Sequence, residues 1–187
     1  MDGYEYVSYE EFGRRFFEIA VSEERVGDAI AAIAGDEFEM GPMGQGPGKI
    51  AKVTAKVRIQ EPRVTRQIDE LITFAIRIPL EIDMVIDLKI DKPKFMVFGE
   101  ISLSAVARAA EPLLLILDVQ KPRPSDVAIH VTSKSLRAEL LRIVAGVDAE
   151  IRRFICQHVA GEIDSPASVK AKVIDVAERL DAAWDGV

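Results

Sequence analysis

Cys156 and His158 are the residue types most typical of nucleophilic or metal chemistry in this chain. On a helix, two residues that are two positions apart point about 200° away from each other, so a thiol and an imidazole so placed cannot meet. His158 continues an apolar helical stripe, which predicts a histidine in the core or at its boundary. His130 alternates with Ile129 and Val131 on a predicted strand, which places it on the surface. We therefore expect no metal site, no cofactor and no conventional enzyme active site.

The glycine-rich segment 41–49 resembles a phosphate-binding loop at first sight. That loop needs a glycine five residues before Gly48, and this position holds Met43. Ile50 also replaces the serine or threonine that follows the loop lysine, and the pattern that comes next is a strand instead of a helix. The segment is therefore interpreted as a flexible or closely packed connector.

Four carboxylates, Glu81, Asp83, Asp87 and Asp91, share one face of a predicted strand. Adjacent members of the aspartate series lie about 13 Å apart along an extended chain, which is too far for one ion or for a shared proton. The pattern favours a solvated outer face.

Basic residues cluster in two predicted turns, 91–94 and 120–126. In a simple meander these turns lie at the same end of the sheet, where they would form a site for an anionic head group or membrane surface. The alternative is a pair of ordinary solvated turns, because several aspartates lie nearby. The candidate head-group residues are Lys89, Lys92, Lys94, Lys121 and Arg123.

Strict alternation of apolar and polar residues predicts a long antiparallel meander. Apolar residues occupy ten consecutive even positions from Ile72 to Ile90, which predicts one strand of about 19 residues. Pro79 interrupts it on the outward face, so we expect an edge or a kink there. Further strands are expected at 53–59, 95–109, 113–119 and 127–131, and 61–69 is interpreted as a polar turn.

Helices are predicted at both ends of the chain. Ser8 and Ser22 are candidate N-caps, with a helix from Ser22 to Gly35, while residues 16–21 fit either a helix or a strand. Apolar residues spaced by three and four predict an amphipathic helix over 136–160. Ser165 is the expected N-cap of a last helix that continues to Trp184.

These elements predict a single α+β domain over 1–187. A long, strongly curved antiparallel β-meander would wrap around a long C-terminal helix, with a short N-terminal helical region and a final C-terminal helix. Its parts are an N-terminal strand or helix region (1–35), the meander (50–132) and two C-terminal helices (134–185).

The composition argues against several other classes of protein. The formal net charge of −7 argues against broad nucleic-acid binding, and 29% charged residues argue against a membrane span or a disordered chain.

The single cysteine and the acidic N-terminus without an apolar core predict a cytoplasmic protein without a signal peptide.

The architecture resembles the tubular lipid-binding (TULIP) superfamily in element order and in the length of strands 71–90 and 95–109. The resemblance implies very long curved strands around a long helix and an apolar groove. The chain also resembles an uncharacterised bacterial protein family over residues 17–26, 41–53, 147–154 and 173–178, a resemblance that implies no activity. A helix-grip fold also fits the element order.

Three functions follow as alternatives. The first is binding of a lipid or another elongated apolar ligand in a groove between the sheet and the long helix. The second is a non-catalytic interaction protein, such as a homodimer paired through an apolar sheet face. The third is a helix-grip carrier or enzyme. The predicted groove residues are Ile76, Ile78, Leu80, Ile82, Met84, Ile86, Ile101, Leu103, Leu115, Leu117, Ile143, Val147, Ile151 and Phe154.

Overall fold

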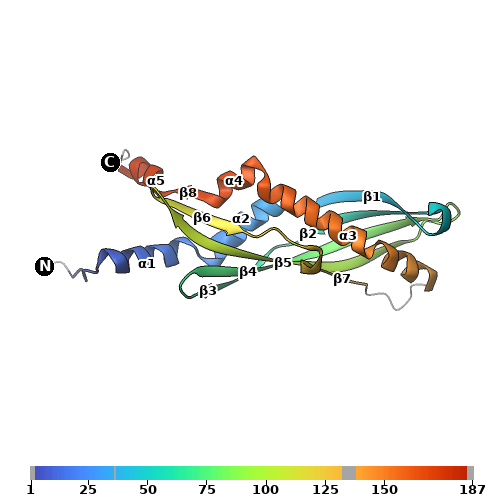
Figure 1. Cartoon of the computed structure of the whole chain (residues 1–187), viewed down its shortest axis with the longest axis horizontal. Coiled ribbons are helices and arrows are strands. Elements are labelled where there is room, and N and C mark those ends of the chain that lie inside the picture. The colour runs from blue at the N-terminus through green and yellow to red at the C-terminus, as the bar shows by residue number, and fades with distance from the viewer. Residues whose placement is uncertain (1–2, 36, 132–137, 185–187) are drawn as a thin grey trace.

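A computed structural model describes residues 3–35, 37–131 and 138–184. The described chain is an α+β fold, in which a strongly curled antiparallel sheet of eight strands forms a half-barrel. Figure 1 shows the long strands lying along the long axis of an elongated molecule, with a long helix running beside them. The strands are β1 (Glu37–Gln45), β2 (Ala51–Ile59), β3 (Arg63–Ile68), β4 (Ile72–Asp87), β5 (Lys94–Ala110), β6 (Leu114–Val119), β7 (Val127–His130) and β8 (Val173–Asp175). The helices are α1 (Tyr9–Ala20), α2 (Glu23–Ala34), α3 (Ala138–Asp164), α4 (Pro166–Lys172) and α5 (Val176–Trp184).

Strands β4 and β5 form the centre of the sheet and pair over most of their length. On the outer side of β4, β2 pairs with residues 80–87 and β3 with residues 72–77, so two short strands follow one another along a single edge. β6 and β7 line β5 in the same way. The sheet is therefore built from one long pair of strands and six shorter ones, with β1 outside β2 and β8 outside β6.

The alternation predicted for β4 is confirmed, because every even residue from Ile72 to Ile86 is buried. The strand ends earlier than predicted, at Asp87, and Ile90 lies fully exposed in the turn that follows. Pro79 lies between neighbours on both sides instead of at an edge. Its carbonyl accepts the N–H of Gln60 at the place where the partner strand changes from β2 to β3. A residue's N–H and carbonyl point to the same side of a strand, so the N–H that proline lacks would also point to the place between β2 and β3. Neither of these strands therefore loses a hydrogen bond of its ladder.

Three predictions about local structure were wrong, and all three concern short edge strands. Most of the expected turn 61–69 forms strand β3 (Arg63–Ile68), and residues 37–45 form β1, which includes much of the expected 41–49 connector. The last helix is divided by β8, which pairs with β6. In each case a free edge of the sheet supplies the hydrogen bonds that a short segment lacks on its own.

The predicted helix starts are confirmed. The Ser8 and Ser22 side chains accept the N–H groups of Glu11 and Arg25, and Ser165 accepts the N–H of Ser168. Residues 16–20 belong to helix α1. Helix α3 extends one turn beyond the predicted 136–160 range, to Asp164, and residues 136–137 lie outside the described part of the chain.

Helix α3 closes the open side of the half-barrel. It contacts β1 at one edge of the sheet and β7 near the other. Apolar residues of α3 and of the inward sheet face join one hydrophobic cluster with α2. No helix in the described part of the chain is long and apolar enough to cross a membrane.

Candidate functional site

Most of the residues predicted to line a groove belong to the single packed core that the inward sheet face forms with α2 and α3. All are buried except Ile143, which is partly buried at the rim, and Phe154, which is 39% exposed at the edge of the helix. Their assignment to a ligand site stays a prediction, because a packed position and a ligand-contacting position follow the same alternation.

An open, mostly apolar cleft lies beside the N-terminal half of α3, at the β1–β2 turn and just beyond the end of β4. We call it the α3 cleft. It has a volume of about 500 Å³. Of the predicted groove residues, Ile143 lines it. The lining residues are Gln45, Gly46, Ile50, Ala51, Leu88, Arg142 and Ile143.

The α3 cleft is built by three segments that are distant in sequence. One wall is the turn from β1 to β2, which contributes Gln45 and Ile50. Leu88 follows the end of β4, where its N–H bonds the carbonyl of Asp91 and closes the turn to β5. Arg142 comes from the second turn of α3. The end of the Gln45 side chain lies against Gly146 of α3, 2.8 Å from the place where a Cβ would be.

The sequence contained one signal for this cleft that the strand pattern did not use. In β2 the even-numbered residues 52, 54, 56 and 58 are polar and point outward, and they alternate with apolar residues that point inward. Ile50 occupies the preceding even position, just before β2 begins at Ala51, and is apolar and 55% exposed. An apolar side chain exposed just before a strand begins is a candidate for contact with something other than the core.

The five candidate head-group cations do not gather at one tip of the molecule. Lys89, Lys92 and Lys94 lie at the β4–β5 turn, but β6 ends beside residue 105 of β5, in the middle of that strand. The loop with Lys121 and Arg123 starts there, so its start lies about 36 Å along β5 from Lys94. The expectation that both turns lie at the same end of the sheet is wrong, because β6 is much shorter than its hairpin partner β5.

Two of these cations are also paired with carboxylates. Lys92 contacts Asp87 at 2.9 Å, and Lys121 contacts Asp164 at the end of α3 at 2.6 Å. The Lys89 N–H and the Lys92 ammonium lower the pKa of Asp87. Asp83, a member of the same carboxylate series, is paired with Arg58 of β2. These contacts favour ordinary solvated turns and ion pairs at the surface.

His158 lies against an aromatic pair at the boundary of the core. Its ring stacks on Phe38 of β1 with centroids 3.9 Å apart, and Phe38 stacks on Phe154 at 6.4 Å. Burial lowers the pKa of the His158 imidazole below its usual value of 6.5, and Glu162 opposes this shift. Burial likewise raises the pKa of the Cys156 thiol, with a further contribution from Asp126. Both directions suit structural residues better than an activated nucleophile and base.

The lowered pKa of His158 predicts a pH-dependent stability. Between its folded and unfolded pKa values the unfolded chain binds more protons, so the free energy of unfolding falls as the pH drops below about 6.5. His158→Phe keeps the stacking on Phe38 and should reduce this loss between pH 7 and pH 5.5, measured by urea denaturation. His130→Phe removes the exposed imidazole of β7 and serves as the control, with a wild-type profile expected. An unchanged profile in His158→Phe contradicts the assignment.

Within residues 3–35, 37–131 and 138–184, no three side chains of histidine, cysteine, aspartate or glutamate gather in a geometry that could hold a metal ion. The chain matches no protein-family model and no curated protein. The resemblances to the TULIP superfamily and to a bacterial family stay predictions.

Proposed function

We propose that this protein binds an amphipathic, single-chain lipid or a similar elongated apolar molecule with an anionic end, and that the ligand enters the α3 cleft. The observation that carries the proposal is the composition of the cleft wall. Ile50, Leu88 and Ile143 present apolar surface, and the basic residue Arg142 lines the same cleft. Ligand sites combine an apolar lining with a few polar groups that orient the ligand in this way.

The size and position of the α3 cleft support this proposal. A volume of about 500 Å³ falls within the range of small-molecule sites, roughly 300–1,000 Å³. The cleft also adjoins the apolar core between α3 and the sheet, since Ile143 lies at the rim of both. A guanidinium binds a carboxylate or phosphate through two parallel hydrogen bonds, so Arg142 favours an anionic end.

A fluorescent derivative of palmitic acid tests the proposal directly. The wild-type protein is expected to bind it in a saturable way, and Ile50→Glu should weaken binding by about 10- to 100-fold. This loss corresponds to roughly 1.5–3 kcal/mol for one buried aliphatic side chain. Ile50 is already 55% exposed, so the substitution leaves the core intact. Ile90→Glu, at a fully exposed isoleucine outside the cleft, is the matched control and should bind as the wild type does.

The same titration with the methyl ester of the probe separates the apolar contact from the charged one. Arg142→Gln should weaken binding of the acid and leave binding of the ester unchanged. Saturable binding of neither compound, or equal binding by Ile50→Glu and the wild type, overturns the proposal. If Arg142→Gln weakens binding of the acid and of the ester equally, the part of the proposal that concerns an anionic end of the ligand is wrong.

A further inference from the structure

Helix α1 has an apolar stripe that the rest of the described chain leaves exposed. The stripe consists of Tyr9, Phe12, Phe16 and Ile19, whose exposed fractions are 98%, 62%, 39% and 71%. No residue of α1 is buried, and the rings of Phe12 and Phe16 stack with centroids 6.4 Å apart. Figure 1 shows α1 at one end of the molecule, near the N-terminus and far from the β1–β2 turn that borders the α3 cleft.

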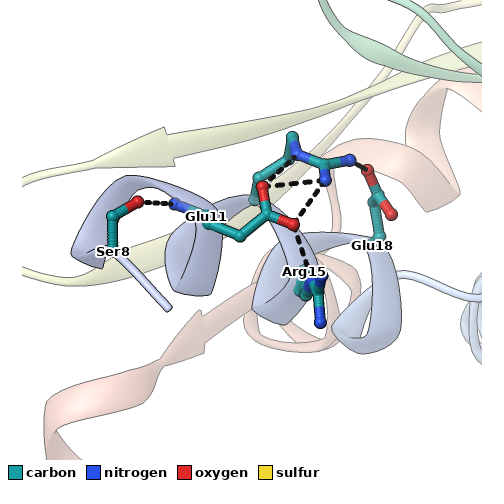
Figure 2. Close-up of polar contacts among 5 residues, drawn as sticks. Ser8, Glu11, Arg15 and Glu18 are labelled. Atoms are coloured by element: carbon teal, nitrogen blue, oxygen red, sulfur yellow. Dashed lines mark hydrogen bonds and ion pairs between the residues drawn. The ribbon is translucent and has the colours of Figure 1, made fainter. Parts of the chain in front are cut away.

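The opposite face of α1 is stabilised by contacts within the helix itself. Ser8 caps the first turn, Glu11 binds both Arg14 and Arg15, and Arg14 also binds Glu18 (Figure 2). The two guanidinium groups lower the pKa of Glu11. These i,i+3 and i,i+4 pairs favour a helix that is formed before anything covers its apolar side. Such a surface loses little conformational entropy when it docks.

The spacing of the α1 stripe matches the seam of a two-helix coiled coil. Its residues follow one another at intervals of three, four and three, which are the intervals of a and d positions. The series is symmetric about position 14. In an antiparallel pair, Tyr9 of each helix therefore meets Ile19 of the other, and Phe12 meets Phe16. A two-fold dimer requires such a patch, which is complementary to itself.

We propose that α1 packs antiparallel against α1 of a second copy of this chain and forms a two-fold dimer. A large side chain presents about 150–250 Å² when fully exposed, so at the exposed fractions of these four residues the stripe offers on the order of 500 Å² per copy. The pair would bury roughly 1,000 Å² in total, which is about the least that a specific interface needs.

The charges of α1 favour a second copy over a lipid surface as the occupant. Helices that lie on membranes carry lysine and arginine on their polar face, which attract anionic lipids. The polar face of α1 instead contains Glu10, Glu11 and Glu18, and both of its arginines contact glutamates. The net charge of the whole chain is −7.

Sedimentation velocity over a range of protein concentrations tests the proposal. The wild-type chain should be a dimer, and Phe12→Glu should raise the dissociation constant about tenfold or more. Phe12 is not buried, so circular dichroism and the melting temperature should stay close to wild-type values. Phe98→Glu changes a comparably exposed phenylalanine on β5, and it should remain dimeric. A monomeric wild type, or Phe12→Glu that dimerises normally, overturns the proposal.

Disulfide formation tests the antiparallel direction. Tyr9→Cys and Ile19→Cys should cross-link with each other when mixed, while each variant alone should stay uncross-linked. The native Cys156 is buried and does not compete. Cross-linking of each variant with itself indicates a parallel pair and overturns the proposed seam. A monomer that binds neutral lipid vesicles through α1, with binding lost in Phe12→Glu, assigns the stripe to a lipid surface instead.

Discussion

Replacing Ile82 by alanine is expected to lower the free energy of unfolding by about 2–5 kcal/mol. Ile82 is fully buried near the middle of β4, between Val57 of β2 and Val97 of β5. Shortening its side chain removes apolar contacts and leaves a cavity that three paired strands cannot easily close. Urea denaturation monitored by circular dichroism measures the loss, provided that the m-value stays unchanged.

Val85→Ala is the matched control for Ile82→Ala. It shortens another β-branched residue of the same strand, but Val85 points outward and is partly exposed. We expect a loss below about 1 kcal/mol for this surface position. Equal losses in the two variants would mean that the inward and outward faces of β4 are not those described.

Gly41→Ala is expected to destabilise the protein by about 2–4 kcal/mol, combining backbone strain with a steric clash. Gly41 has a φ of +104°, and an added Cβ would lie 2.5 Å from the carbonyl oxygen of Val53. It would also lie 3.2 Å from Cα of Thr54. Both atoms belong to the backbone of β2, so no side-chain rotation relieves the contact. The register between β1 and β2 shifts at this point, and the glycine permits that bulge.

Gly35→Ala separates strain from clash. Gly35 also has a positive φ, of +73°, but an added Cβ would meet nothing within 4 Å. Its cost should therefore be the conformational part alone, about 1–2 kcal/mol. Thermal unfolding of both variants gives the comparison. If Gly41→Ala costs no more than Gly35→Ala, the close approach of β1 to β2 is not rigid.

Much of the fold could be predicted because its signals are local. The alternation from Ile72 to Ile86 identifies the buried face of β4, since successive side chains of a strand point to opposite sides. The serine caps at Ser8, Ser22 and Ser165 identify helix starts because the caps bond only their own first turn. The length of β4 and the long amphipathic helix were enough to predict a curved sheet around α3.

The short strands could not be predicted from local pattern. Residues 63–68 read Arg-Val-Thr-Arg-Gln-Ile and expose most of their side chains. Their strand conformation depends on the hydrogen bonds that β4 offers to one side. β8 likewise depends on the free edge of β6. A partner far away in sequence supplies the stabilising bonds, so propensity alone favoured a turn or a helix at these positions.

The amino-acid sequence by itself determined which residues face inward, because alternation and helical spacing are properties of the local chain. Only the tertiary structure decided which of these residues fill the packed core and which border open space. Ile82 and Ile143 carry the same apolar signal, yet one is sealed between three strands and the other lies beside the α3 cleft. The difference depends on the neighbours that each isoleucine meets: Ile82 has strand partners on both sides, while Ile143 meets the β1–β2 turn and Leu88 across an open cleft. These neighbours come from segments that are distant in sequence, so local pattern could not identify them.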